Sequence, residues 1–155
     1  MITYVSAIFG ITVALLLYNG WYVTAGIFFL TSYILDCMDG NMARMYNMVT
    51  DYGDKLDHVT DMIQIMCTII VIVIHPVFTL KVKIIALIVI GLSMFGAFIH
   101  IGCQEKSYQK QTTDTLSSFE KLCSDKEMIK YTRFIGTGTA AIVISILFVY
   151  FKMTH

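Results

Sequence analysis

The feature that most constrains this chain is a succession of apolar runs, each close to the length that crosses a lipid bilayer. A transmembrane helix needs about 20 mostly apolar residues. Turn signals separate the runs, among them Asn19-Gly20 and the helix breaker His75-Pro76. The runs are residues 2–18, 21–35 with a helical pattern that continues to about Tyr46, 51–74, 77–101 and 131–150. We therefore predict one all-α domain over residues 1–155, a membrane bundle of five or six transmembrane helices.

Composition agrees with a membrane protein. Hydrophobic residues make up 57% of the chain and charged residues 14%, whereas a soluble domain carries roughly 25% charged residues. The zero formal net charge argues against a nucleic-acid partner. The cysteines form no CxxC pair, so neither a zinc site nor a disulfide framework is expected. The first run lacks a preceding basic segment, so we interpret it as a retained span and not as a signal peptide.

The basic residues predict how the bundle is oriented. Because five spans alternate sides, the linker between the second and third runs shares a side with the polar segment 102–130. That side carries Arg44, Lys55, Lys106, Lys110, Lys121, Lys126, Lys130 and Arg133, and the other side carries Lys81, Lys83 and Lys152. By the positive-inside rule, the chain is expected to be a multi-pass protein with this linker on the cytosolic face of a membrane that the sequence does not specify.

An acidic stretch interrupts the apolar chain between the second and third runs. Ionisable side chains within a span cost roughly 2.5–3.5 kcal/mol at mid-helix, so they are functional candidates. Asp36 and Asp39 are three residues apart, and Asp57 and Asp61 are four apart, so each pair lies on one face of its helix. The short linker predicts an antiparallel hairpin. The four carboxylates can then converge near one end of the bundle.

Such a group of carboxylates predicts a metal site. Unpaired carboxylates at this spacing would repel one another, and divalent cations remove that repulsion. Ligands that are all oxygen suit Mg²⁺ or Mn²⁺ better than zinc or copper. Two such ions close together neutralise both the oxygens of a diphosphate and its leaving group. We therefore expect two Mg²⁺ or Mn²⁺ ions as cofactors.

Small and basic residues around the aspartates are consistent with a phosphate ligand. Gly40 and Ala43 leave room for a bulky group to approach the helix backbone. Arg44, one turn beyond Gly40, can hold a phosphate through a fork of hydrogen bonds. Gly53 would allow the third helix to approach closely or the linker to turn.

Other interpretations of the polar residues stay open at this point. Thr50 or Asp51 could cap the third helix, and for Asp51 and Asp54 a cap or an interfacial charge is the favoured interpretation. Aspartates inside a membrane can also join helices by hydrogen bonds or line an ion path. A cation channel, a transporter or a non-catalytic cation-binding membrane protein would gather carboxylates too.

The spacing of the acidic stretch resembles the signature of the CDP-alcohol phosphatidyltransferase family, D-x2-D-G-x2-A-R-x8-G-x3-D-x3-D. The matching positions are Asp36, Asp39, Gly40, Ala43, Arg44, Gly53, Asp57 and Asp61. Eight positions at the required spacing make this far more specific than a usual short motif. The likeness in spans and loop order extends over most of the chain, but only the motif is specific.

The resemblance implies a phosphotransferase and assigns roles to the aspartates. Asp36, Asp39 and Asp57 would hold two Mg²⁺ or Mn²⁺ ions, and Asp61 would both bind metal and act as the base. The alcohol would attack the lipid-side phosphorus of CDP-diacylglycerol, giving a phospholipid and CMP. By the same resemblance, the residues that would bind the CDP-lipid are Gly40, Ala43, Arg44, Thr50 and Gly53.

The chain departs from the family pattern in two ways. The family usually has six spans, and we count five. The family also usually has a segment before the first span that carries an Asn and a Thr near the cytidine, and here only Thr3 is available. The chain is then a minimal member, a member that depends on a dimer, or one with weakened activity. The resemblance implies a homodimer, although no feature of the sequence requires one.

The acceptor alcohol is indicated only by cues outside the aspartates. The segment YGDKLDHVTDM is similar to the phosphatidylinositol synthase branch, and so is the sequence Lys130-Tyr131-Thr132-Arg133 before the last span. Arg133 could hold a phosphate or sugar hydroxyls, or it could be an interfacial anchor. We expect myo-inositol as the acceptor. The rival activities are choline or ethanolamine phosphotransfer and phosphatidylglycerophosphate synthesis.

Overall fold

The computed structural model describes residues 2–46, 50–108 and 129–153. The backbone alone is described for Ile2, Thr3, Arg44, Asp51, Asp54, Lys55, Asp57, His58, Arg133 and residues 104–108. The structure divides into two compact units, each treated by itself below. Unit 1 comprises Met1–Leu87 and Ser145–His155, and unit 2 comprises Ile88–Ile144.

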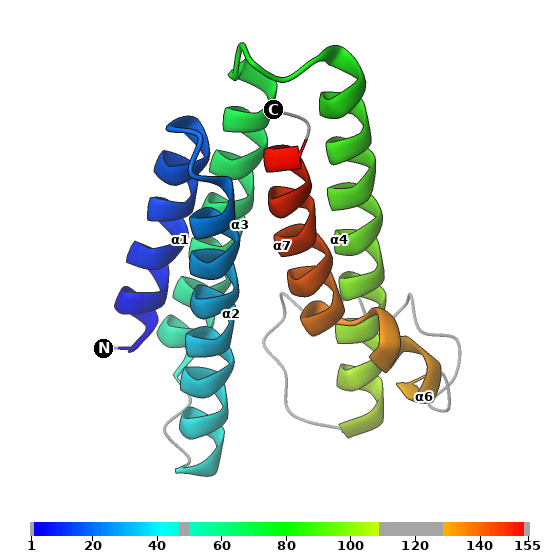
Figure 1. The fold of residues 1–155 in the computed structure, drawn as a ribbon. Helices are drawn as coiled ribbons and strands as arrows, with labels where there is room; N and C mark the ends of the chain where they lie inside the picture. Colours follow the sequence, from blue (N-terminus) through cyan, green and yellow to red (C-terminus); the bar gives the residue numbers. More distant parts are fainter. Residues whose placement is uncertain (1, 47–49, 109–128, 154–155) are drawn as a thin grey trace. The chain divides into compact units, whose positions relative to one another are not determined.

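The described residues form helices joined by short turns and contain no strand (Figure 1). The long helices are α1 (Ile2–Tyr18), α2 (Tyr22–Met45), α3 (Asp51–Ile74), α4 (Leu80–Tyr108) and α7 (Thr137–Met153). Two short elements, α6 (Ile129–Thr132) and the 3-10 helix η2 (Arg133–Ile135), precede α7. The all-α prediction and the five long helices are confirmed.

Two predicted boundaries were wrong. The fourth helix was expected over 77–101, but α4 continues to Tyr108 because Gln, Glu and Lys are good helix formers and polarity alone does not end a helix. The fifth was expected from Tyr131, but α7 begins at Thr137 after Gly136 leaves the helical region at φ −72° and ψ −176°. The remainder of the predicted polar segment, 109–128, lies outside the described residues.

Two helical stretches of the described chain are long and apolar enough to cross a membrane. They are Leu80–Cys103, with 24 residues, and Ile129–Met153, with 25 residues. The apolar stretches Tyr4–Tyr18 and Val59–Ile74 are shorter than the usual length of a span. Many large apolar side chains point outward, as lipid-facing residues do: Ile8, Leu15, Ile27, Leu92 and Ile146 are each more than half exposed.

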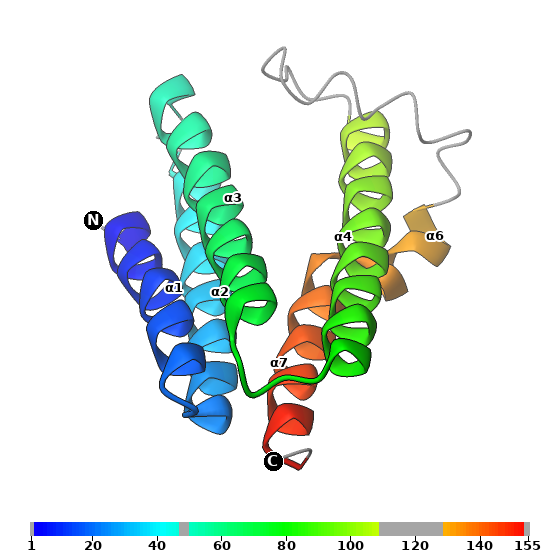
Figure 2. The same ribbon diagram turned by 90° about the horizontal axis from the view of Figure 1, so that it is seen from above.

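In unit 1, α1 packs against both α2 and α3 (Figure 2). The inward face of α1 carries Ser6, Val13 and Leu17, which recur at helical spacing and are all buried. The turn into α2 is made by Asn19-Gly20, as predicted, with Gly20 in the left-handed region at φ +79°. The nitrogen of Trp21 donates to the carbonyl of Leu16 at 2.9 Å, which closes the turn.

An aromatic cluster closes the end of unit 1 where α2 begins and α3 ends. It consists of Tyr18, Tyr22, Phe29, His75, Phe78, Phe148 and Phe151. The rings of Phe78 and Phe151 are 4.6 Å apart, and the rings of His75 and Phe78 are 4.7 Å apart. The cluster therefore joins the last residues of α7 to α2 and to the segment that follows α3.

His75 is buried but fully hydrogen-bonded within this cluster. The nitrogen of Val77 donates to Nδ1 of His75 at 3.3 Å, and Nε2 lies 3.1 Å from the carbonyl oxygen of Tyr18. Because Nδ1 accepts a hydrogen bond from Val77, the proton of the neutral ring lies on Nε2, which donates to the carbonyl oxygen of Tyr18. The break predicted at His75-Pro76 thus also ties the end of α3 to the end of α1.

In unit 2, α4 meets the segment before α7 at very close range. A Cβ atom at Gly136 would stand 2.6 Å from Cδ2 of His100, and one at Gly96 would stand 3.0 Å from the carbonyl oxygen of Ile135. Nδ1 of His100 lies 3.2 Å from Oγ1 of the buried Thr132. Two glycines and one side-chain hydrogen bond therefore hold η2 against α4.

The cysteines correct one expectation. Cys37 and Cys67 are free, but Cys103 is buried and disulfide-bonded. The absence of CxxC spacing excludes only pairs that are local in sequence, which is why the disulfide was missed.

Candidate functional site

The two halves of the motif lie on helices that turn back on one another. Asp36 and Asp39 lie in the C-terminal half of α2, and Asp57 and Asp61 lie in the N-terminal half of α3. Since α2 ends at Met45 and α3 begins at Asp51, the motif ends of the two helices are neighbours. Figure 1 shows α2 continuing past the N-terminal end of α1, and Figure 2 shows α3 beginning beyond it.

A buried polar layer lies directly beneath the aspartates. Oγ of Ser32 on α2 is 2.8 Å from the carbonyl oxygen of Ser6 on α1 and 3.3 Å from Oε1 of Gln64 on α3. A hydroxyl has one proton, which Ser32 donates to Ser6 over the shorter distance. The contact with Gln64 is therefore best satisfied with the amide turned so that its nitrogen donates to Ser32.

This layer determines which faces of α2 and α3 meet. Asp36 follows Ser32 by four residues and Asp61 precedes Gln64 by three, so each lies on the face that makes the contact. Because the helices are antiparallel, both aspartates are displaced toward the same end, by about 6 Å and about 4.5 Å along the axes. Their backbone positions are therefore at nearly the same level.

The second pair of aspartates, Asp39 and Asp57, also lies on the contacting faces of α2 and α3, about one turn further from the layer. Asp39 lies seven residues after Ser32, and Asp57 lies seven residues before Gln64. Seven residues are close to two full helical turns, so both positions stay near the contacting faces. The four motif positions thus form two levels, Asp36 with Asp61 and Asp39 with Asp57.

The carboxylates differ in exposure. Asp36 and Asp39 are half-buried, and Asp61 is exposed. Among the described residues no group of three or more His, Cys, Asp or Glu side chains lies close enough to hold a metal ion, and the side chain of Asp57 is not described. The structure therefore brings the motif positions to one end of the helix pair without a closed set of ligands.

A helix cap fixes the start of α3, next to the linker between the two halves of the motif. Thr50 is the N-cap of α3, and its Oγ1 accepts a hydrogen bond from the nitrogen of Gly53 at 3.1 Å. A Cβ atom at Gly53 would stand 3.0 Å from that oxygen, so a larger residue would crowd the cap. Capping by Thr50 is one of the two alternatives that the sequence left open.

The remaining predicted site residues are located by their backbone or by exposure alone. Gly40 and Ala43 are half-buried on α2, and Arg44 lies in the last turn of α2. Arg133 belongs to η2 in unit 2, directly after Thr132, whose hydroxyl contacts His100. The side chains of both arginines lie outside the description.

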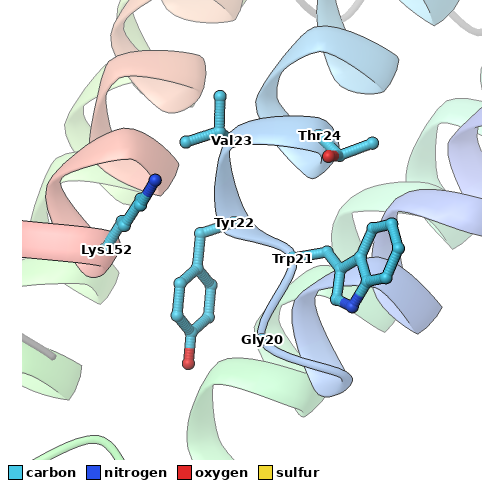
Figure 3. Close-up of a pocket in the computed structure, with 6 residues that line it drawn as sticks. All are labelled: Gly20, Trp21, Tyr22, Val23, Thr24 and Lys152. Carbon is cyan, nitrogen blue, oxygen red and sulfur yellow. The ribbon is translucent and has the colours of Figure 1, made fainter.

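A pocket in the described structure lies away from the motif. It has a volume of about 480 Å³ and is lined by Gly20, Trp21, Tyr22, Val23, Thr24 and Lys152 (Figure 3). A second pocket of about 360 Å³ shares Gly20 and Tyr22 with it and includes His75. Both lie at the end of unit 1 where α2 begins, the end opposite the aspartates.

Fold and comparison together identify the class of protein. The all-α fold, its outward-facing apolar side chains and two helical stretches apolar enough to cross a membrane are those of an all-α membrane protein. The family model described as CDP-alcohol phosphatidyltransferase matches residues 1–153. The chain belongs to this family of membrane-embedded phosphotransferases of phospholipid synthesis (EC 2.7.8), which generally depend on divalent metal ions. No curated protein and no solved structure matches the chain.

Sequence reasoning missed the polar layer beneath the motif. The layer consists of isolated polar residues within apolar runs, namely Ser6, Ser32 and Gln64. No contact between them was predicted. A usable signal was present, since Ser32 precedes Asp36 by one turn and Gln64 follows Asp61 by nearly one turn. Polar residues that continue a charged helical face inward are candidates for contacts between helices.

Proposed function

We propose that this protein transfers a phosphatidyl group from CDP-diacylglycerol to a small alcohol in a metal-dependent reaction that releases CMP. The observation that carries the proposal is the contact of Ser32 with Gln64. It supports an arrangement in which the four motif aspartates lie on facing sides of α2 and α3, with Asp36 level with Asp61 and Asp39 level with Asp57. Two paired levels of carboxylates are what two divalent ions bound side by side would require.

The donor set fits such ions. Asp36, Asp39, Asp57 and Asp61 offer only carboxylate oxygens, which are the ligands of Mg²⁺ and Mn²⁺. These four residues would hold two ions, which supply charge neutralisation for the diphosphate and for the departing CMP. The half-burial of Asp36 and Asp39 strengthens their attraction to a cation, because the local dielectric is lower than in water.

Asp61 is the proposed general base. Its carboxylate takes the proton from the hydroxyl of the acceptor alcohol, and the alcohol oxygen forms a bond to the lipid-side phosphorus of CDP-diacylglycerol. The bond from that phosphorus to the bridging oxygen breaks, and CMP leaves with the electron pair. The exposure of Asp61 suits this role, because a water-soluble alcohol must reach it.

The CDP-lipid is proposed to lie along the motif end of α2. The small residues Gly40 and Ala43 let the ligand approach the backbone of α2 closely. Arg44 supplies a planar, permanently charged partner for a phosphate. Thr50 accepts from Gly53, which leaves its own hydroxyl proton available to donate to the ligand. Gly53 keeps that cap uncrowded.

The acceptor is proposed to be myo-inositol, with Arg133 as the residue that holds its hydroxyls. Supporting this is the likeness of YGDKLDHVTDM and of Lys130-Tyr131-Thr132-Arg133 to the phosphatidylinositol synthase branch. We further propose a multi-pass topology with the motif end toward the cytosol, and a homodimer. The excess of basic residues on the motif side supports the orientation.

CMP release by the purified protein in lipid bilayers tests the reaction. With CDP-diacylglycerol and Mg²⁺ or Mn²⁺, we expect release with myo-inositol and none with glycerol 3-phosphate. The same assay with CDP-choline or CDP-ethanolamine and diacylglycerol covers the other rivals. Metal binding without CMP release for any substrate pair would contradict the enzymatic proposal in favour of a cation-binding protein.

Asp61→Asn tests the base. We expect CMP release to fall by about 10²–10⁴-fold, the usual contribution of a positioned general base, with little loss of CDP-lipid binding. The matched control is Met62→Ala, at the exposed neighbour of Asp61 on α3, which should release CMP as wild type does. Wild-type turnover by Asp61→Asn would remove Asp61 from the role of base.

A further inference from the structure

The polar layer beneath the motif is more than a local contact, because it joins three helices. Ser32 is 3% exposed and Ser6 is 4% exposed, so both lie in the interior of unit 1. Gln64 on α3 contacts Ser32 on α2. A Cβ atom at Gly10 would stand 2.6 Å from Cδ of Gln64, so α1 offers the amide a site that only glycine leaves open.

Apolar contacts between helices do not fix the level of one helix against the other. A helix pair that slides by one turn exchanges one set of Ile, Leu and Phe contacts for a similar set, because such contacts have no direction. A buried hydrogen bond has a single position, and sliding would leave Ser32 and Gln64 unpaired in an apolar interior. A single buried polar contact is an established way of specifying helix register.

The level of α2 against α3 is also what brings the aspartates together. Asp36 and Asp61 lie one turn above the layer on the same two faces, and slippage by one turn would move them apart by about 5 Å. That displacement exceeds the distance between a divalent ion and a carboxylate oxygen, which is about 2.0–2.1 Å for Mg²⁺. The affinity of the aspartates for a cation must therefore depend on the layer.

We propose that Ser32 and Gln64 are positioning residues of the divalent-cation site, and that their hydrogen bond holds α2 and α3 at the level where Asp36 and Asp61 can share an ion. The inference rests on the proposed function for the identity of the ion. Ser32 and Gln64 touch neither the substrate nor the ion, and act only through the helices that carry the aspartates.

Titration of the purified, bilayer-embedded protein with Mn²⁺ tests the proposal, with the electron paramagnetic resonance signal of free Mn²⁺ as the readout. We expect Ser32→Ala and Gln64→Leu each to weaken Mn²⁺ binding about 10-fold or more, the usual effect of losing a residue that orients ligands. Ser32→Thr keeps the hydroxyl and should bind Mn²⁺ as wild type does. Gln64→Asn, whose amide is one methylene too short to reach Ser32, is the milder variant if the others do not fold.

Thr68→Val is the matched control. Thr68 is buried on the same face of α3, and its hydroxyl donates to the carbonyl of Gln64 at 2.9 Å within the helix. Losing that bond removes a buried hydrogen bond without releasing α2 from α3. We expect Mn²⁺ affinity within about twofold of wild type. An equal loss in Thr68→Val and Ser32→Ala would attribute the effect to general destabilisation and overturn the proposal.

A distance measurement without metal separates this proposal from the proposed reaction. Nitroxide labels on the free thiols of Cys37 on α2 and Cys67 on α3 report the level of one helix against the other. The distribution of distances should broaden or shift in Ser32→Ala and stay unchanged in Thr68→Val, with Cys37→Ser as the single-label background. Unchanged distances together with unchanged Mn²⁺ affinity in Ser32→Ala would overturn the positioning role. Absence of CMP release with Mn²⁺ binding and distances as expected would contradict the reaction alone.

Discussion

At the end of unit 1 where α2 begins, six aromatic rings cluster with a buried histidine whose two ring nitrogens are both hydrogen-bonded. At the other end of the same two helices, the side chains are carboxylates that are half-buried or exposed. One end contains what a stable interior needs, close contacts and satisfied polar groups. The other carries charged side chains, which are costly inside a membrane and are therefore candidates for function. Between the two ends lies the layer of Ser32 and Gln64, which we propose sets the level of α2 against α3.

Removal of divalent ions by a chelator should affect only the motif end of the molecule, and it should cause the largest loss of CMP release among these tests. Addition of EDTA should abolish CMP release, and excess Mg²⁺ or Mn²⁺ should restore it. Mn²⁺ at about 100 times its dissociation constant should also stabilise the folded protein by about 2.7 kcal/mol, by linkage. That stabilisation should disappear in Asp36→Asn. Its persistence in Asp36→Asn would separate the metal site from the motif.

Phe151→Ala should damage the aromatic end and spare the motif. Phe151 is fully buried and contacts the rings of Tyr22 and Phe78. We expect a loss of about 3–5 kcal/mol in unfolding free energy, measured by denaturant titration. Ile146→Ala on the exposed face of α7 is the control and should change little. Wild-type Mn²⁺ affinity in the folded Phe151→Ala protein is expected, and a large loss would contradict the independence of the two ends.

His75→Leu should have a smaller effect at the same end. The substitution keeps an apolar side chain of similar bulk but removes both hydrogen bonds, which leaves the carbonyl of Tyr18 and the nitrogen of Val77 without them. An unsatisfied buried group costs about 1–3 kcal/mol. Thermal unfolding should report this loss, with CMP release at low temperature close to wild type. A stability equal to wild type would show that water satisfies these groups instead.

Thr50→Ala should give the smallest change, at the motif end. Loss of an N-cap costs about 1 kcal/mol, and hydrogen exchange should increase in the first turn of α3. Thr50→Ser keeps the capping oxygen and should exchange as wild type does. If Thr50 also donates to the CDP-lipid, KM for CDP-diacylglycerol should rise in Thr50→Ala but not in Thr50→Ser. A rise in both variants would assign that effect to the methyl group.

Local signals in the sequence were sufficient for much of the fold. The bounds of α3 follow from the cap at Thr50 and the break at His75-Pro76, and the first turn follows from Asn19-Gly20. These elements depend on residues within a few positions of one another, so a single stretch of sequence carries the information. The motif aspartates could be assigned to helix faces for the same reason.

Features that depend on contacts between distant segments could not be predicted. The break before α7 arises because Gly136 must pass the ring of His100, and the disulfide of Cys103 depends on a long-range pairing. The hydrogen bond between Ser32 and Gln64 spans 32 positions. Each looks ordinary in sequence, since a glycine, a cysteine or a serine in an apolar run has many uses.

The length of α2 places the chemistry at a particular depth. From Trp21, an aromatic residue of the kind that marks a membrane interface, to Asp36 is about 22 Å along the helix axis. The hydrocarbon layer of a bilayer is about 30 Å thick. In the proposed orientation Asp36 therefore lies about 8 Å inside the cytosolic boundary of the hydrocarbon layer, below the level of the lipid glycerol backbone, and the soluble alcohol must descend to reach it. Thinner or thicker host bilayers would shift that meeting point, so turnover should follow the acyl-chain length of the surrounding lipids.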